Sequence, residues 1–207
     1  MIVDDNQLEV LVGCLLGDGY ITKRGSIQIE QGARQKDYLL WKYEQLKSLV
    51  SVKPSKVVRT NKKNGRIAYS YRFFLRQFFR VWREKMYVNG KKIVPADLID
   101  IATPLSLAIW YMDDGSLGDY SYLIISTDGF DNESQARIVR ILKSKWDINA
   151  RIVDKKNGGK LYKRLVIGSH NLVKFFSLIR PYIIPSMQYK ISDPVTTQSI
   201  KRRHRDL

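Results

Sequence analysis

The chain has 207 residues, of which 44% are hydrophobic and 11% aromatic, so it can bury the core of one large domain or two small ones. It holds no apolar run near the roughly 20 residues that a membrane-spanning helix needs, and its acidic start lacks the basic segment of a secretory signal. With one cysteine and two histidines, neither an internal disulfide nor a structural zinc site is expected. The net charge of +16 instead predicts a polyanionic partner.

The excess positive charge is concentrated in one segment. Residues 53–92 contain 13 Lys and Arg residues and a single acid, Glu84. A charged run is often only a solvated face, but here the aromatic residues Tyr69, Tyr71 and Trp82 lie among the cations. Basic and aromatic residues together favour a nucleic-acid-binding surface.

The first half of the chain predicts a helix, two strands, a helix, a second pair of strands and a final helix. An apolar helix ends at Asp18-Gly19, and the alternating segment 20–31 turns at Arg24-Gly25. The remaining elements are a helix at 36–50, strands at 55–60 and 67–75 joined by the turn at 63–65, and a helix at 75–87.

The second half repeats this order after a joining stretch at 89–102. Thr103 as N-cap and Pro104 at the first helical position begin an apolar helix that ends at Asp114-Gly115, 96 residues after Asp18-Gly19. The other elements are strands within 116–127 with a turn at 118–119, a helix at 133–146 with a capping box from Asn132 to Gln135, strands at 149–154 and 161–168, and a helix at 169–182.

This repeat predicts an α+β fold of two pseudo-symmetric α-β-β-α-β-β-α halves, each with a four-stranded antiparallel sheet. We place the first half with its joining stretch at residues 1–100, the second half at 101–195 and a basic tail at 196–207. The joining stretch is short and not rich in Gly or Ser, so we expect closely docked halves.

Each apolar helix ends in an aspartate, although the helix dipole disfavours negative charge at a helix C-terminus. A lone Asp-Gly is usually a helix stop, but two in repeat register favour a function. Divalent cations prefer carboxylate and carbonyl oxygens, and helices packed side by side would bring Asp18 and Asp114 together. Two carboxylates beside a basic surface indicate a metal-dependent phosphodiester hydrolase.

Segments 11–19 and 107–115 resemble two copies of the LAGLIDADG motif. Over about residues 8–195 the chain resembles single-chain LAGLIDADG homing endonucleases, and among them the mitochondrial omega-intron endonuclease subgroup in particular. The first motif ends Leu16-Gly17-Asp18-Gly19-Tyr20-Ile21, the second spans 103–115, and the flanks 91–95 and 179–190 also match.

The resemblance implies a pseudo-dimer within one chain, and therefore a monomer, with the motif helices at its interface and the sheets forming a saddle over the DNA major groove. It implies Asp18 and Asp114 as catalytic metal ligands and Lys92 and Lys190 as catalytic lysines. Gly17 and Asp113 precede the two acids at the candidate metal site, Asp113 as a neighbour of the metal and not a ligand.

The implied cofactor is Mg²⁺, with Mn²⁺ able to substitute. The implied reaction hydrolyses one phosphodiester in each strand of a long, asymmetric site, leaves short 3′ overhangs and initiates intron homing. On the second motif helix, Ile109 and Met112 take positions of small residues, and we expect Gly13 and Gly17 on the first helix to accommodate them.

We expect alternating strand residues on the concave faces of the sheets to contact double-stranded DNA, with Arg suited to guanine and Gln to adenine. The candidates are Lys23, Arg24, Gln28, Glu30, Arg34, Arg59, Lys62, Arg66, Tyr69, Tyr71 and Arg72 in the first half, and Tyr120, Tyr122, Arg151, Lys155, Lys160, Tyr162 and Arg164 in the second.

Two alternatives stay open. One is an intron RNA maturase on the same fold, which a basic surface suits equally, although both acids favour nuclease activity. The other is a non-catalytic DNA-binding regulator, which the lack of an added helix-turn-helix segment disfavours. The resemblance predicts an intracellular location, in a mitochondrion or chloroplast, and no membrane partner.

Overall fold

The computed structural model describes residues 2–118 and 121–191, without the side chains of residues 157 and 160. The predicted basic tail and the last four residues of the predicted second half lie outside this part. Within it, every helix is too short or too polar to cross a bilayer.

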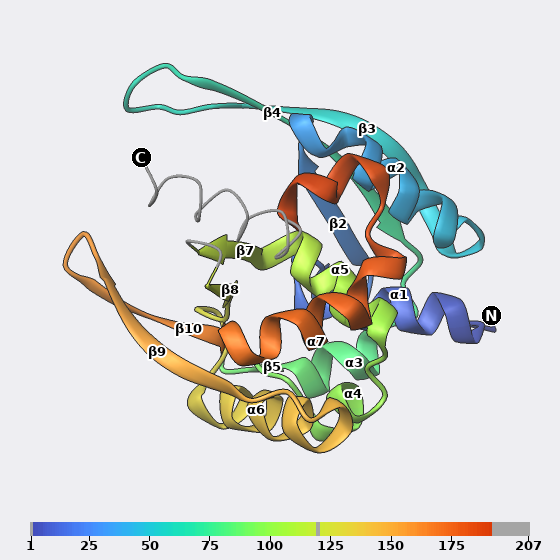
Figure 1. Cartoon of the computed structure of the whole chain (residues 1–207). Helices are drawn as coiled ribbons and strands as arrows, with labels where there is room; N and C mark the ends of the chain where they lie inside the picture. Colours follow the sequence, from blue (N-terminus) through green and yellow to red (C-terminus); the bar gives the residue numbers. More distant parts are fainter. Residues whose placement is uncertain (1, 119–120, 192–207) are drawn as a thin grey trace.

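The two motif helices, α1 (Asp5–Leu16) and α5 (Pro104–Asp114), pack against each other at the centre of the molecule (Figure 1). Thr103 caps α5 as predicted, because its side chain accepts from the Ser106 amide. The helices approach very closely. A methyl group added at Gly13 would lie 2.7 Å from Ile109 Cβ and 2.7 Å from the Ser106 carbonyl oxygen. Gly13 therefore accommodates Ile109, as expected.

The two halves build equivalent antiparallel sheets, which confirms the predicted fold class. The first sheet has the order β1-β2-β4-β3 and the second β7-β8-β10-β9. Their bounds are β1 (Tyr20–Ile21), β2 (Ile27–Gly32), β3 (Val50–Thr60), β4 (Ile67–Leu75), β7 (Gly115–Gly118), β8 (Tyr122–Ser126), β9 (Ala150–Asn157) and β10 (Lys160–Gly168). The hairpins β3–β4 and β9–β10 project toward the same side of the molecule (Figure 1).

The other helices are α2 (Lys36–Gln45), α3 (Arg80–Met86), α4 (Ala96–Asp100), α6 (Asn132–Trp146) and α7 (Ser169–Ile179), with 3₁₀ turns at Ala33–Gln35, Lys47–Leu49, Arg180–Tyr182 and Pro185–Lys190. In the first half, α2 covers one face of the sheet, where Tyr43 packs edge-on against Phe73 at 5.8 Å. In the second half, α6 contacts β9, and α7 contacts β8 and β10.

Some sequence-based expectations were wrong in detail, and the joining stretch has structure that they did not include. The third helix begins at Arg80 and not at residue 75, because Leu75 is a buried strand residue. The joining stretch is structured, with a hairpin of β5 (Tyr87–Val88) and β6 (Lys91–Lys92) followed by α4. The N-cap of α6 is Asp131, whose side chain accepts from the Ser134 amide, so the cap lies one residue before Asn132.

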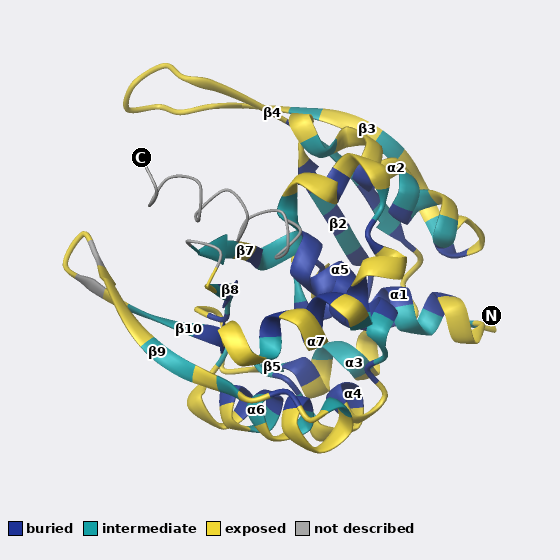
Figure 2. Ribbon diagram, viewed as in Figure 1, coloured by how far each residue is buried: buried dark blue, intermediate teal, exposed yellow. Residues whose placement is uncertain are grey.

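One core joins the two halves. It includes Leu11 and Leu15 of α1, Trp110 of α5 and Phe175 of α7, all fully buried. The ends of the two long hairpins are exposed (Figure 2). The buried helix pair thus forms the centre of the molecule, and the two long hairpins extend from the sheets to its surface.

Candidate active site

The C-terminal ends of α1 and α5 bring together the residues that the sequence singles out for chemistry. Asp18 lies two residues beyond the end of α1 and is exposed, whereas Asp114 is the last residue of α5 and is half-buried. Gln31 Nε2 donates to Asp18 Oδ2 at 3.1 Å. Within the described residues, no protein group hydrogen-bonds the Asp114 carboxylate.

Lys92 and Lys190 occupy equivalent places, one at each helix end. Lys92 Nζ donates to the carbonyl oxygens of Gly17 at 3.0 Å and Gly19 at 3.1 Å. Lys190 Nζ donates to the carbonyl of Gly115 at 3.0 Å, to that of Asp113 at 3.2 Å and to that of Met112. Each lysine therefore places positive charge where the helix dipole is negative.

Burial and mutual repulsion perturb these groups strongly. Burial, with the nearby Asp18 and Asp113 carboxylates, raises the pKa of Asp114 to about 7. Partial desolvation at the exposed Asp18, with the nearby Asp113 carboxylate, also raises the pKa of Asp18. Burial lowers the pKa of Lys92 to about 8, although the acids oppose this, and it lowers the pKa of Lys190 as well. Such perturbed groups in one cluster are typical of a functional site.

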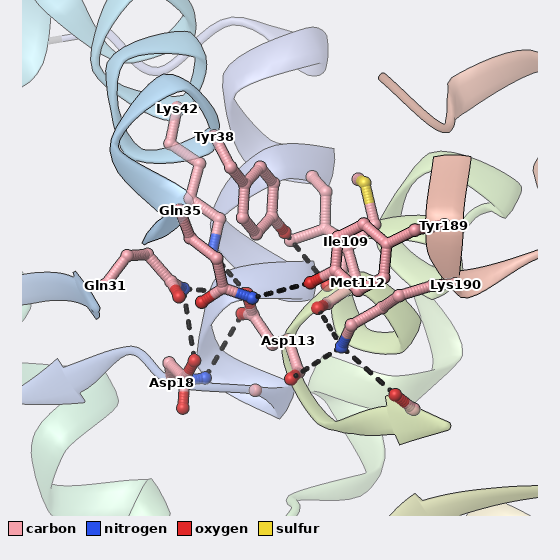
Figure 3. A network of polar contacts seen from close by, with 12 residues as sticks. Asp18, Gln31, Gln35, Tyr38, Lys42, Ile109, Met112, Asp113, Tyr189 and Lys190 are labelled. Atoms are coloured by element: carbon pink, nitrogen blue, oxygen red, sulfur yellow. Dashed lines mark hydrogen bonds and ion pairs between the residues drawn. The ribbon is translucent and has the colours of Figure 1, made fainter. Parts of the chain in front are cut away.

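Asp113 has more protein partners than Asp18 or Asp114, and Figure 3 shows its contacts. Its carboxylate accepts from Lys42 Nζ at 2.6 Å, from Gln31 Nε2 at 2.9 Å and from the Asp18 backbone amide at 3.2 Å. The side chains of Lys42 and Asp113 are both 0% exposed. Protein donors therefore occupy the Asp113 carboxylate, and Asp113 lies beside Asp18 in the place of a neighbour and not of a ligand.

The contact at Gly17 also differs from expectation. A methyl group added there would lie 2.4 Å from Asp113 Oδ2, so Gly17 leaves room for Asp113 and not for Met112. The Gly17 carbonyl already accepts from Lys92.

Sequence reasoning missed Gln31 and Lys42. Both carried a signal, because each is a polar residue at a core-facing position. Gln31 continues the alternation of Ile27 and Ile29 in β2, and Lys42 follows Leu39 by one helical turn in α2.

Strand register decides which DNA-binding candidates share a face. In the first sheet, Glu30 pairs with Arg72, and Arg59 lies on the same face. This face also carries Gln28 and is opposite to the one covered by α2. Lys23, Arg24, Arg34, Lys62 and Arg66 are exposed in the loops and turns around it.

Tyr69 and Tyr71 do not belong to this face. They alternate in step with Phe73, which packs against α2. Lys36 of α2 lies 5.1 Å from the Tyr71 ring and Lys56 lies 4.2 Å from the Tyr69 ring. Their assignment to the concave face was wrong, because one strand cannot present consecutive odd and even residues on one side.

In the second sheet, the candidates that the structure describes gather on one face. Tyr122, Arg151, Lys155, Tyr162 and Arg164 alternate in register on the side away from the core residues Leu123 and Leu165. Tyr120 and the side chain of Lys160 lie outside the described part of the chain.

Arg72 and Arg164 are equivalent residues of the two sheets, and each is anchored by an acid. Arg72 lies 3.7 Å from Glu30, and Arg164 lies 3.0 Å from Asp128. Glu30 also binds Arg59 at 2.9 Å, and this hydrogen bond holds the pKa of Glu30 below its usual value. Within the described residues, the buried Nε atoms of both arginines lack a hydrogen-bond partner.

Comparison with known proteins gives the family. Residues 8–175 match the model of the LAGLIDADG DNA endonuclease family, and the chain belongs to this family. It is 31% identical over 204 residues to a probable intron-encoded endonuclease 1 of Wickerhamomyces canadensis, covering 89% of this chain and 83% of that one.

Other relatives carry different names. The chain is 28% identical to the cytochrome b mRNA maturase bI2 of Debaryomyces hansenii, covering 92% of this chain and 75% of that protein. It is 29% identical to the protein RecA of Mycobacterium gastri, but spans only 48% of it. Several of the curated relatives are thus about twice as long as the matched region.

A solved structure has the same arrangement. The homing endonuclease I-WcaI bound to its DNA recognition sequence superposes with a TM-score of 0.80 at 29% identity, covering 93% of this chain and 88% of that one. This match supports the saddle of two antiparallel sheets on a pair of central helices.

Proposed function

We propose that this chain is a site-specific endonuclease that cuts both strands of a long, asymmetric DNA target and thereby initiates intron homing. The observation that carries the proposal is the duplicated site at the helix ends. Each end combines one acid that forms no ion pair with the described residues and one lysine bound to the carbonyl groups at the end of the same helix. Each end also lies beside a sheet that carries arginines.

The sheet faces that carry Arg72 and Arg164, opposite to the faces that pack against the core, support binding of duplex DNA. Arg72 and Arg164 occupy equivalent central positions and retain unpaired buried N–H groups within the described residues. Acids on the same faces hold the guanidinium groups in fixed orientations, which suits recognition of base edges. The I-WcaI structure, which contains that enzyme's recognition DNA, supports the same use of the saddle.

Asp18 and Asp114 fit a divalent metal. Within the described residues the Asp114 carboxylate accepts no hydrogen bond from the protein, and its pKa is raised to about 7. A bound cation would relieve the repulsion among the carboxylates. Within the part of the chain that the structure describes, no group of three His, Cys, Asp or Glu side chains could hold a metal. The remaining ligands would therefore be DNA phosphates and water, as is common for Mg²⁺.

When bound, Mg²⁺ or Mn²⁺ would activate water and stabilise charge on the scissile phosphate. The residues of the chain would position the metal and the scissile phosphates. Asp18 and Asp114 would each face one strand, and Lys92 and Lys190 would add positive charge at the two phosphates. Because the pKa of Lys92 is lowered to about 8, its ammonium can also exchange a proton near neutral pH.

The second candidate function is that of an intron RNA maturase, favoured by the similarity to the bI2 maturase. The basic faces would bind RNA as well as DNA. A maturase has no need of two acids with perturbed pKa values at one site, so the nuclease is the better supported function. An organelle is the location that we propose, since these named relatives are encoded by introns or act on cytochrome b mRNA.

A cleavage assay on a randomised duplex library in Mg²⁺ tests the proposal. Sequencing of the cut ends should recover one long site with short 3′ overhangs. Asp18→Asn and Asp114→Asn should each abolish cutting in Mg²⁺, while a gel shift in Ca²⁺ shows that binding persists. Binding to RNA without any DNA cleavage would refute the nuclease and favour the maturase.

A further inference from the structure

We propose that the buried Lys42–Asp113 pair is a positioning device for Asp18, and that it makes the two cleavage centres unequal. The inference rests on the proposed nuclease function and concerns one side of that site. Lys42 and Asp113 do not themselves contact DNA or metal in this proposal. They act through Gln31 and the backbone of Asp18 (Figure 3).

The contacts form a continuous path to Asp18. The Gln31 amide donates to Asp18 Oδ2 at 3.1 Å and to Asp113 Oδ1 at 2.9 Å. Both of its partners are acceptors, so the amide nitrogen must face both carboxylates. Asp113 Oδ2 in turn accepts from the Asp18 backbone amide at 3.2 Å. Asp113 thus holds Asp18 by the side chain, through Gln31, and by the main chain directly.

Lys42 fixes Asp113 in this position. Its ammonium lies 2.6 Å from Asp113 Oδ1 and 4.2 Å from the centre of the Tyr38 ring, and the lysine is fully buried. The Tyr38 hydroxyl donates to the Ile109 carbonyl at 3.1 Å. Helix α2 of the first half is therefore fastened to α5 of the second half directly beside the candidate metal site.

At the equivalent described positions, the other half has different residues. A shift of 96 residues carries Asp18 to Asp114, and the same shift carries Gln31 to Thr127, Lys42 to Ile138 and Gly17 to Asp113. Thr127 Oγ1 donates to the Lys163 carbonyl and does not reach Asp114. Ile138 is buried and apolar. A polar network thus holds Asp18, whereas the Asp114 carboxylate has no hydrogen-bond partner within the described residues.

The difference in hydrogen bonding between Asp18 and Asp114 has a consequence for metal binding. A carboxylate whose partners fix its position loses less freedom when it binds a metal. We therefore expect the centre that depends on Asp18 to act first, so that the strand it serves is nicked before the other strand.

Two variants test the device on a duplex that carries the recovered target site and is labelled on either strand. Lys42→Ile with Asp113→Gly installs the residues that the chain itself uses at the equivalent positions, Ile138 and Gly17. Gln31→Leu removes only the link and leaves the buried ion pair intact. Thr127→Val is the matched control in the second half.

Both test variants should slow nicking of the same single strand by roughly 10- to 100-fold, the usual effect of removing a supporting partner of a metal ligand. The other strand and the affinity for DNA in Ca²⁺ should change little, and Thr127→Val should cut like the parent. Equal slowing of both strands, or no slowing, would overturn the inference, since a purely structural role has no preference between strands.

The outcomes stay distinguishable from failure of the proposed function. A parent protein that cuts neither strand refutes the nuclease itself. A parent that cuts, with variants that show no strand preference, refutes only the positioning role. If the double variant fails to fold by thermal unfolding, Gln31→Leu decides alone.

Discussion

Because the motif helices pack closely at Gly13, we expect the substitution Gly13→Ala to lower the stability of the protein. Alanine is favoured over glycine within a helix by about 1 kcal/mol, so the substitution would stabilise an isolated α1. In the protein, the new methyl group would lie 2.7 Å from both Ile109 Cβ and the Ser106 carbonyl oxygen. Both atoms belong to α5 and lie on or next to its backbone, not at the end of a flexible side chain. Only separation of α1 from α5 can therefore relieve the overlap.

Overpacking of this kind costs about 1–3 kcal/mol, and a contact with backbone belongs at or above the upper end. After the gain in helix propensity, we expect a net loss of about 2 kcal/mol, which lowers Tm by roughly 4–8 °C in a chain of this length. Thermal unfolding measures this shift. Gly129→Ala is the control, because its added methyl group meets no atom within 4 Å. A Gly13→Ala protein as stable as the parent would refute the close crossing of α1 and α5.

Three further outcomes follow from charge. DNA affinity should fall steeply with salt, because on the order of ten neutralised phosphates each add about −0.9 to the slope of log affinity against log salt concentration. A binding titration at several salt concentrations measures this slope, and a slope near zero would exclude DNA binding by the basic saddle. Asp113→Asn should destabilise by about 3–5 kcal/mol in urea unfolding, because it leaves the Lys42 ammonium buried without its partner; a loss below 1 kcal/mol would contradict the ion pair. Without metal, Asp114→Asn should raise Tm relative to the parent at pH 8 but not at pH 4. The Asp114 carboxyl has a pKa near 3.8 when unfolded and about 7 when folded, so its contribution to stability is lost as pH rises toward 7; equal Tm differences at both pH values would contradict this shift.

The repeated order of elements could be predicted from the sequence because it depends on local signals. Alternation marks β2, a short apolar run marks β8, and Asp-Gly marks the end of both motif helices. A hairpin signal was nevertheless overlooked in the joining stretch. Asn89 and Gly90 have positive φ angles of 49° and 76° and connect β5 to β6. Asn-Gly is a strong turn pair, but strands of two residues show no alternation that could confirm it.

The polar support of the site could not be predicted in the same way. Lys42 and Asp113 are 71 residues apart in the chain and on different halves, so only the packing of α2 against α5 brings them together. Sequence alone marks Lys42 as a charged residue on an apolar helix face. It does not say whether the ammonium reaches solvent, as lysines on such faces usually do, or a buried partner.

The arrangement also explains why the two motif copies differ at the residue before each acid. The helix ends are so close that positions 17 and 113 compete for one space, since any side chain at Gly17 would collide with Asp113. One copy must therefore have glycine if the other has a larger residue. A buried aspartate needs a buried cation, and Lys42 supplies it from the first half only. Once both halves belong to one chain, each can change independently, so a single asymmetric contact at the pseudo-twofold axis is enough to separate the roles of two otherwise equivalent acids.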